Sequence, residues 1–361
     1  MALSRTPGIG PARLARLLER FAAPAAVLAA SRQDLTAAAA LPEAALDYLA
    51  APDWGRVEQD LAWLARPGNH LLTWGDALYP PLLRQIARPP PLLFVHGDPA
   101  CLGAAQIAMV GTRNPTPGGR QTARDFAAYL AGGGVVITSG LALGVDAESH
   151  RGALEAGGRT IAVMATGADR IYPSQHRDLA HAIAGGGALV TEFPPGTPPL
   201  AEYFPRRNRL ISGLSLGVLV VEAAHRSGSL ITARLAAEQG REVFAIPGSI
   251  HNPLARGCHA LIRQGAKLVE TAADILEELG PLAAAGARPP DAASPEAPPP
   301  AELDEDYRRL LEQLGGEPAP VDLLVERCGL TADVVSSMLL ILELQGHVVA
   351  HPGGLYSRST G

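Results

Sequence analysis

The chain has 361 residues, a formal net charge of −6 and 47% apolar residues, so it can bury full cores and a wholly disordered chain is excluded. At roughly 100–200 residues for each domain, this length predicts two or three domains. The acidic total argues against a nucleic-acid partner, because proteins that bind nucleic acids usually carry a basic excess, although a total can hide local differences.

The cysteines and the apolar runs indicate a reducing, aqueous compartment. Cys101, Cys258 and Cys328 stand far apart and form no CxxC pair, which disfavours a disulfide framework or a zinc site and predicts buried thiols. The first 18 residues hold no apolar signal core, and the longest apolar stretch, 214–221, is far shorter than the ~20 residues of a membrane span. We expect a soluble cytoplasmic protein with no membrane partner, no metal and no cofactor.

Residues 1–70 are rich in Ala and Leu at helical spacing, which predicts a small helical domain. Residues 4–20 are similar to a helix-hairpin-helix (SAM-like) motif, in which Gly8 and Gly10 permit a tight turn before a helix that carries arginines. That motif normally has a full helix before the turn, whereas here only seven residues precede Gly8. A purely structural lobe is therefore favoured over DNA contact, which stays open.

Residues 71–280 alternate short apolar runs with helical patterns. The predicted strands are 107–110, 135–138, 160–164, 188–191, 218–221 and 243–246, and helices such as 120–130, 147–156 and 230–239 lie between them. Near-continuous apolar strands that alternate with helices are typical of a parallel sheet covered on both faces. The pattern predicts a doubly wound α/β domain with ligands at the carboxyl ends of its strands.

Glycine-rich turns follow four of these strands, at 111–113, 139–146, 226–232 and 247–249. Glycine lets the backbone turn tightly and expose its N–H groups, and a following helix N-terminus adds partial positive charge, so such turns bind anions. One turn of this kind is weak support, but four at one sheet edge favour a phosphate-type ligand. None of these four turns has the spacing of a GxGxxG fingerprint, a P-loop or a GxSxG elbow.

The segment 203–209, Tyr-Phe-Pro-Arg-Arg-Asn-Arg, concentrates cations beside two aromatics in a chain with 4% aromatics. Arginine grips phosphates through a planar fork, and aromatic faces beside a cationic groove bind single-stranded nucleic acid. The alternative is a solvated turn whose aromatics fill the edge of the core. Beside the four glycine-rich turns, we favour the binding interpretation.

The motifs GTR, SGLALGVDAESH, YFPRRNRLISGLS, RSGSLIT and FAIPGS with GCHALIRQGAKLV resemble, in order and spacing, the bacterial DNA processing protein A (DprA/Smf) family over roughly residues 70–280. The resemblance implies an extended Rossmann-like core that binds single-stranded DNA and forms a homodimer. It also implies a non-enzymatic role, in which the protein protects incoming DNA and promotes RecA loading during natural transformation and recombination.

The resemblance also implies site residues. The candidate DNA-binding residues are Gly111, Thr112, Arg113, Ser139, Gly140, Arg177, Arg206, Arg207, Asn208, Arg209, Gly228, Ser229 and Lys267. The family often has a lysine after Tyr172-Pro173, where this chain has Ser174, so a phosphate contact there is either lost or taken over by Arg177. His259, Ile262 and Leu268 resemble the family's dimer interface; the alternative is an ordinary helix and strand packed on the sheet.

Two carboxylates, Asp146 and Glu222, are the candidates to weigh for catalysis. Asp146 lies where it can cap a helix N-terminus, and Glu222 ends a strand near the glycine-rich turns. The competing enzyme hypothesis is a nucleoside-monophosphate phosphoribohydrolase, a class with a related core and a PGGxGTxxE motif. Here the matching turn reads RSGSLITARLAAE, which lacks the GT and the glutamate spacing, so we expect no catalytic residues.

The C-terminal part is acidic. Residues 281–300 hold seven Pro and seven Ala and predict a linker to about 301, and 302–361 predict a winged helix, with helices at 307–314, 321–328 and 332–344 and a hairpin at 347–350 and 355–357. Residues 281–361 carry five basic and 12 acidic residues, net −7. Because no Lys or Arg occurs from 331 to 345, we expect this domain to contact protein rather than DNA.

Overall fold

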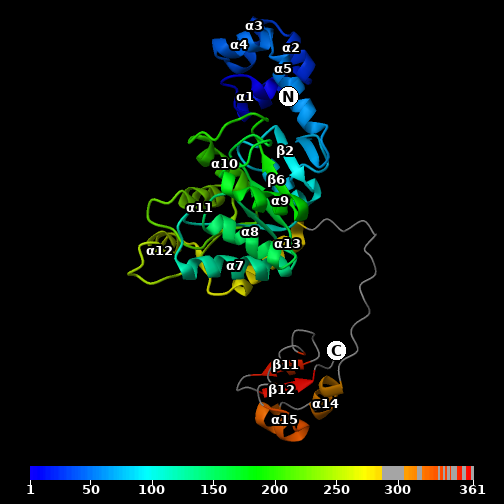
Figure 1. The fold of residues 1–361 in the computed structure, drawn as a ribbon, viewed down its shortest axis with the longest axis vertical. Helices are drawn as coiled ribbons and strands as arrows, with labels where there is room; N and C mark the ends of the chain where they lie inside the picture. Colours follow the sequence, from blue (N-terminus) through cyan, green and yellow to red (C-terminus); the bar gives the residue numbers. More distant parts are fainter. Residues whose placement is uncertain are drawn as a thin grey trace. The chain divides into compact units, whose positions relative to one another are not determined.

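The computed structural model describes residues 1–286, 305–314, 319–331, 334–335, 338–339, 342, 348–351 and 355–358 (Figure 1). The chain divides into two compact units, Met1–Arg288 and Pro289–Gly361. Within the described residues, no helix is both long and apolar enough to cross a membrane, and no group of three or more His, Cys, Asp and Glu side chains could hold a metal ion.

The first unit begins with short helices, as the Ala- and Leu-rich pattern predicts. These are η1 (Ala2–Arg5), α1 (Pro11–Phe21), α2 (Pro24–Ala29), α3 (Arg32–Ala39), α4 (Glu43–Ala50) and α5 (Trp54–Leu64). Gly8 has a positive φ of 68° in the turn before α1, and only one 3₁₀ turn precedes it. Ser31 and Asp53 cap α3 and α5, because each side chain accepts the backbone N–H of the third residue of its helix.

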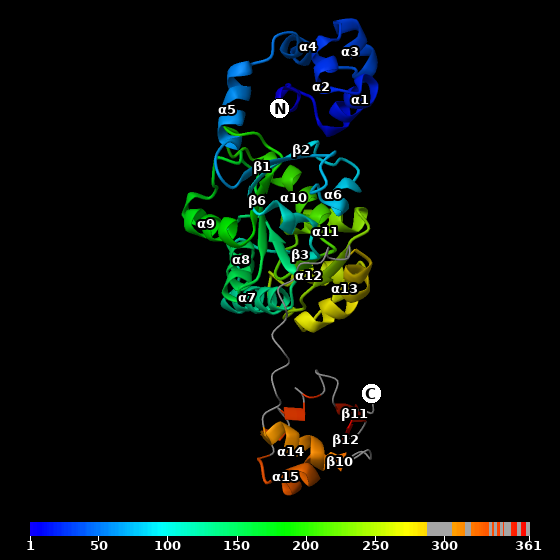
Figure 2. The same cartoon turned by 90° about the vertical axis from the view of Figure 1, so that its right-hand side faces the viewer.

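A nine-stranded sheet forms the centre of this unit (Figures 1 and 2). Its strands are β1 (Asn69–Thr73), β2 (Leu92–Gly97), β3 (Gln106–Val110), β4 (Val136–Ser139), β5 (Thr160–Val163), β6 (Ala188–Thr191), β7 (Gly217–Val220), β8 (Glu242–Ala245) and β9 (Lys267–Leu268), in the spatial order β1-β2-β6-β5-β4-β3-β7-β8-β9. The six predicted strands are confirmed, and all pairings from β6 to β9 are parallel. Three strands were not predicted from the sequence: β1 and β2, which pair antiparallel and extend one edge of the sheet, and β9, which ends the other edge.

Helices cover both faces of the sheet, which explains its near-continuous apolar strands. Along β3, Ala108 and Val110 pack in the cluster with α6 (Pro81–Arg84), α10 (Tyr203–Leu214), α11 (Ser229–Glu238) and α12 (Arg256–Arg263). Ile107 and Met109 point the other way, into the cluster with α7 (Pro117–Gly132), α8 (Val145–Glu155) and α13 (Ala272–Gly286). The smaller helix α9 (Arg177–Gly186) packs beside α8.

The strand order reverses beside β3. The chain runs outward from β3 through β4 and β5 to β6, and then returns to place β7 on the other side of β3. The loops that leave β3 and β7 therefore diverge, and ligands of doubly wound sheets bind in the crevice at such a switch point.

The second unit holds two described helices and a small antiparallel sheet. The elements are α14 (Glu305–Gln313), β10 (Ala319–Pro320), α15 (Val321–Cys328), β11 (Val348–His351) and β12 (Leu355–Arg358), with sheet order β10-β12-β11. The predicted hairpin is confirmed. Most of the predicted third helix, 332–344, lies outside the described residues. Of the predicted linker, 281–301, residues 287–301 also lie outside them, whereas 281–286 continue the helix α13.

The three cysteines are free and buried, as predicted. Burial raises the pKa of the Cys101 thiol to about 12 and that of Cys258 to about 11. These thiols are therefore protonated at neutral pH and act as small apolar side chains.

Candidate nucleic-acid interface

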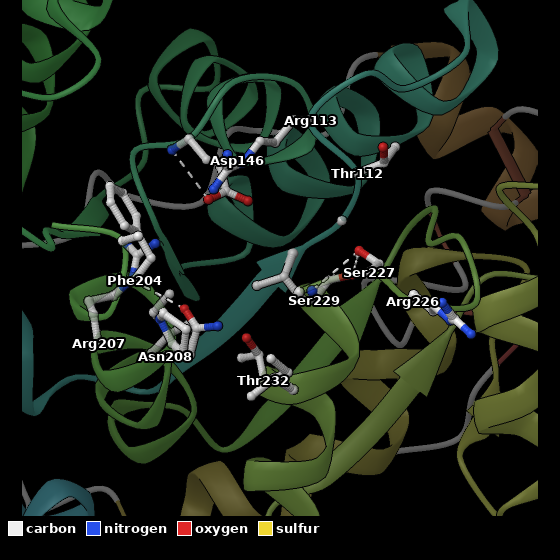
Figure 3. A pocket seen from close by; sticks show the side chains of 18 of the residues that line it. Thr112, Arg113, Asp146, Phe204, Arg207, Asn208, Arg226, Ser227, Ser229 and Thr232 are labelled. Carbon is white, nitrogen blue, oxygen red and sulfur yellow. Dashed lines mark hydrogen bonds between the residues drawn. The ribbon is translucent and has the colours of Figure 1, made fainter. Parts of the chain in front are cut away.

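A pocket of ≈ 730 Å³ opens at the switch point, where the loops after β3, β4 and β7 meet the start of α10 (Figure 3). Seven of the candidate DNA-binding residues line it, namely Gly111, Thr112, Arg113, Arg207, Asn208, Gly228 and Ser229. The six that do not line it are Ser139, Gly140, Arg177, Arg206, Arg209 and Lys267. Segments far apart in the sequence thus come together as the four glycine-rich turns led us to expect, although the turn at 247–249 stays outside.

One wall of the pocket can bind anions. The loop between β7 and α11 presents the exposed Arg226, and α11 begins at Ser229, whose Oγ lies 2.7 Å from the Oγ of Ser227. The N-terminus of α11, which carries partial positive charge, and the cationic Arg226 both line this wall. Arg226, Ser227 and Thr232 also line the pocket, and they were not among the candidate residues although they lie in the predicted anion-binding turn 226–232.

The opposite side is aromatic and cationic. The Phe204 ring stands edge-to-face against Tyr172, with centroids 5.6 Å apart, and the Arg113 guanidinium lies 5.9 Å from the Phe204 centroid. Tyr172 remains 49% exposed and also lines the pocket, so an apolar face is open to a ligand there. A planar ligand that stacks on these rings meets the same Arg113 that can contact a phosphate.

The floor holds two buried charges, Asp146 and Arg207, on either side of Gly140. A Cβ atom on Gly140 would lie 2.4 Å from Asp146 Oδ2 and 2.6 Å from Nη1 and Nη2 of Arg207, so only glycine fits. Arg207 donates from Nη1 to the Val163 carbonyl, and Asp146 Oδ2 accepts the Ala142 N–H at 3.3 Å. Burial lowers the pKa of Arg207 to about 10 and raises the pKa of Asp146.

Neighbouring arginines on the helix α10 have different partners. Segment 203–209 forms its first turns, so Arg207 and Asn208 face the pocket. Arg206 and Arg209 instead pair with the buried Glu192, with an Arg206 Nε to Oε1 distance of 3.1 Å, and Arg209 also donates to the Arg88 carbonyl at 2.5 Å. The segment is thus part of a helix rather than a solvated turn, although Tyr203 does stack on the buried Phe193, with ring centroids 4.4 Å apart. The helical phase divides its cations between the pocket and Glu192.

Buried side chains hold the loop after β4 from below. His150 contacts the Gly140 carbonyl through Nε2 at 2.7 Å, and His176 contacts the Leu141 carbonyl through Nδ1 at 3.0 Å. Ser139 donates to the Met109 carbonyl at 2.6 Å and is fully buried. Burial lowers the pKa of His150 to about 4, so the imidazole is neutral at pH 7.

The two candidate carboxylates have separate partners. Glu222 accepts hydrogen bonds from the N–H and hydroxyl of Thr116, at 2.9 and 2.7 Å, at the N-terminus of α7. The expectation that Asp146 caps its own helix is wrong: Gly144 is the N-cap of α8, with a φ of 77°, and Asp146 instead accepts an N–H from the preceding loop.

The remaining predicted residues lie elsewhere. Lys267, on the edge strand β9, pairs with Glu278 at 2.5 Å, and Arg177 is exposed at the start of α9. In the predicted dimer interface, Leu268 on β9 is 44% exposed, while Ile262 packs partly against the core and His259 bonds to the Gly248 carbonyl at 2.9 Å.

The fold and the pocket define a doubly wound, Rossmann-like α/β protein with a mixed cationic and aromatic site at its switch point. Residues 70–280 match the family DNA recombination-mediator protein A, and residues 294–354 match the DprA winged helix domain. The chain belongs to the DprA/Smf family of DNA processing proteins. The resemblance, the extended Rossmann-like core and the winged-helix prediction are confirmed.

Relatives and solved structures are similar over most of the chain. Protein Smf of Escherichia coli (strain K12) is 47% identical over 302 residues, covering 82% of this chain and 80% of that protein. The X-ray structure of DNA processing protein A from Streptococcus pneumoniae has a TM-score of 0.69 and 35% identity, covering 76% of this chain and 95% of that one. The Helicobacter pylori protein, described for its single-stranded DNA binding mode, has a TM-score of 0.54 and 30% identity, covering 59% of this chain and 96% of that one.

Proposed function

We propose that this protein binds single-stranded DNA in the switch-point pocket without catalysing a reaction on it, and that it protects incoming DNA and promotes RecA loading during natural transformation. The observation that carries the proposal is the pairing of exposed arginines, Arg113 and Arg226, with the aromatic pair Phe204 and Tyr172 around one pocket. The single-stranded DNA binding described for the Helicobacter pylori relative supports it.

The arrangement suits a single strand better than a duplex. Bases of a single strand are free to stack on Phe204 and Tyr172, at roughly 1–3 kcal/mol for each stacked base. The backbone phosphates then lie within reach of Arg113, Arg226 and the N-terminus of α11. In a duplex the base faces are already stacked on one another, so the aromatic side of the pocket has nothing to contact.

The environment of the Glu222 carboxylate supports a non-catalytic role. Hydrolysis needs a positioned acid or base within reach of the substrate. Glu222 is 8% exposed and is engaged as an acceptor at the N-terminus of α7, where a Cβ on Gly119 would lie 2.4 Å from its carboxylate carbon. A group so enclosed serves the packing of α7 against the β7 loop.

The other proposed contacts follow the same hypothesis. We infer that two copies associate through β9 and α12, because β9 is the edge strand of the sheet, Leu268 on it is exposed, and Ile262 on α12 is only partly buried. An unpaired strand edge with an apolar side chain favours pairing with another chain. We further propose that the protein works in the cytoplasm, and that its acidic winged-helix unit contacts protein rather than DNA.

The test measures fluorescence anisotropy of labelled oligo-dT and of a duplex of equal length. The wild type should prefer oligo-dT, and Arg113→Ala should weaken that binding by roughly 10- to 100-fold, because a charge-assisted contact contributes about 1.5–3 kcal/mol. Arg159→Ala is the matched control, since this arginine side chain is 60% exposed and lies before β5, at the opposite ends of the strands.

Equal affinity for the duplex, or no loss in Arg113→Ala, would contradict the proposed site. Catalysis is tested separately by incubating the protein with nucleoside monophosphates and measuring free base. Release of base above the rate without protein would contradict the non-catalytic role.

A further inference from the structure

The N-terminal helices contain a buried ion pair that also contacts the chain beside the pocket. Arg5 donates from Nε to Oδ2 of Asp60, on α5, at 2.7 Å, and it donates from Nη2 to the Pro195 carbonyl at 2.9 Å. The Asp60 side chain is fully buried, and that of Arg5 is 12% exposed. Because the guanidinium is planar and presents several donors in fixed directions, one arginine can hold both partners at once.

Pro195 belongs to the segment 194–202, which we call the strap and which lies between β6 and α10. The strap has prolines at 194, 195, 198 and 199, and each proline ring fixes its own φ near −65°. A segment so rich in proline is semi-rigid, so a contact that fixes one end also restricts the other. That other end lines the pocket through Pro199 and Ala201.

The strap is connected to both elements that carry the aromatic side of the pocket. The Gly196 N–H donates to Oδ1 of Asp169 at 2.7 Å. Asp169 lies in the loop after β5, and this loop continues to Tyr172. In the other direction the strap leads directly into α10, whose second residue is Phe204. The position of the strap therefore affects both rings.

The N-terminal helices do not themselves reach the pocket. Among the described residues, those that line it begin at Val110, so none belongs to residues 1–70. The turn before α1 is packed within its own helices, because a Cβ on Gly8 would lie 3.0 Å from Cγ of Pro42 and Arg13 donates to the Gly8 carbonyl at 2.8 Å. These contacts favour an indirect contribution of the N-terminal helices to binding.

We propose that Arg5 is a positioning residue for the binding of single-stranded DNA. Through the Pro195 carbonyl it holds the strap, and the strap holds Tyr172 and Phe204 in the arrangement on which bases stack. The N-terminal helices thus raise the affinity for bases without contacting DNA. This inference rests on the proposed binding of single-stranded DNA at the switch-point pocket.

The test replaces the ion pair by apolar side chains, in the double variant Arg5→Met/Asp60→Leu of the full-length protein. Exchange of a buried ion pair for apolar residues of similar volume is often neutral for stability, and it leaves the net charge unchanged. The donor to the Pro195 carbonyl is lost. The probes are labelled oligo-dT and an abasic strand of equal length, which keeps the phosphates but has no bases, titrated by anisotropy at a salt concentration at which the wild type binds both.

The double variant should bind oligo-dT about tenfold more weakly than the wild type, as the loss of roughly one stacked base predicts. Its affinity for the abasic strand should change less than twofold. Partial unfolding, or the loss of a phosphate contact, lowers the affinity for both strands by the same factor. Equal losses for the two strands, or an unchanged affinity for oligo-dT, would therefore overturn the proposal.

The matched control is Arg32→Met/Asp47→Leu, which makes the same two substitutions at another ion pair of the N-terminal helices. Arg32 Nη1 lies 2.9 Å from Oδ1 of Asp47, and both side chains are about half exposed or more. This pair has no contact with the strap among the described residues, so the control should bind both strands as the wild type does. A loss for oligo-dT as large as that of Arg5→Met/Asp60→Leu would overturn the proposal.

Thr197→Val tests the strap without changing the N-terminal helices, and it decides the question even if the double variant does not fold. The Thr197 hydroxyl donates to the Pro194 carbonyl at 2.6 Å, and valine keeps the shape of the side chain but not this hydrogen bond. Affinity for oligo-dT should fall about threefold, as the loss of one hydrogen bond within the strap predicts, and affinity for the abasic strand should not change. An unchanged affinity for oligo-dT would overturn the proposal.

Failure of this inference differs from failure of the proposed function. If the wild type binds oligo-dT and the double variant binds it equally well, the positioning role of Arg5 is wrong and single-stranded DNA binding stands. If the wild type does not bind oligo-dT, both proposals are wrong.

Discussion

The molecule contains two groups of arginines that differ in their partners, and the helix α10 contributes residues to both groups. Arg207 belongs to the pocket group, together with Arg113 and Arg226 on the loops after β3 and β7. Arg206 and Arg209 form the Glu192 group, in which both guanidinium groups pair with one carboxylate that is 3% exposed. Neighbouring residues of the same type thus divide between a ligand site and the packing of the fold.

The partner of an arginine, rather than its charge alone, decides whether it can bind a ligand. A guanidinium whose charge is already satisfied by a buried carboxylate gains little from a phosphate. Among the residues that the structure describes, Arg113 and Arg226 form no ion pair, so their charges are available to a ligand. We therefore expect substitutions in the pocket group to change affinity, and those in the Glu192 group to change stability.

The largest effect is expected for Arg209→Ala. Its side chain is 13% exposed, and its removal leaves Glu192 with Arg206 alone and the Arg88 carbonyl without its donor. Breaking a buried pair costs about 3–5 kcal/mol, so the free energy of unfolding should fall by roughly 3 kcal/mol, measured by urea denaturation. Affinity for oligo-dT should change less than twofold in the folded variant.

Arg206→Ala is the matched control for this variant. It pairs with the same carboxylate, but its side chain is 44% exposed, so its loss should cost only about 0–1 kcal/mol. Equal losses of stability in the two variants, or a loss of affinity in Arg209→Ala as large as in Arg113→Ala, would remove the distinction between the groups.

His150 supports the loop after β4, below the pocket, and differs from the pocket arginines because it is fully buried. Its pKa is lowered to about 4 by burial, from an ordinary value of 6.5. As the pH falls below 6.5 the unfolded chain takes up a proton that the folded chain does not bind until about pH 4. This histidine therefore contributes on the order of 3 kcal/mol to the free energy of unfolding above pH 6.5, and that contribution is lost as the pH falls from 6.5 to about 4.

The variant His150→Gln should remove this part of the acid sensitivity, because glutamine can donate to the Gly140 carbonyl but does not titrate. The measurement is the free energy of unfolding at pH 7.5 and at pH 5, compared between variant and wild type. His181→Gln, at an exposed histidine, is the control and should keep the dependence of the wild type. If wild type and His150→Gln lose stability in parallel, His150 is not the titrating group.

The sequence alone could predict the strands and the edge at which the ligand site lies. Apolar runs such as 107–110 and 218–221 are buried on both faces, and each is followed by a glycine-rich turn, so both signals are local. The sequence could not show which cations of segment 203–209 face the pocket and which pair with Glu192. That division depends on the helical phase of α10 and on the position of Glu192, which is 14 residues from Arg206 in the chain. Long-range pairing of this kind leaves no local signal.

The pocket also contains residues that the sequence pattern could not rank. Arg226 and Thr232 lie in the same motif as Gly228 and Ser229, but only the tertiary structure shows that all four line one wall. The close packing of Asp146 and Arg207 over Gly140 depends on three residues that are separated in the chain and approach each other in space. In the sequence these three residues lie apart, and nothing local indicates that they come together.

The smallest expected effect is a change in salt dependence, and it separates the two arginine groups most directly. Each phosphate contact on a single strand contributes about −0.7 to the slope of log affinity against log salt. Arg226→Ala should therefore reduce the slope for oligo-dT by roughly 0.7, because this exposed arginine lines the proposed DNA pocket. Arg206→Ala, which removes the same formal charge from the surface, should leave the slope unchanged, because that charge is already neutralised by Glu192. A general attraction between DNA and a cationic surface predicts equal changes in both variants, and that result would show that net charge, rather than the pocket geometry, governs binding.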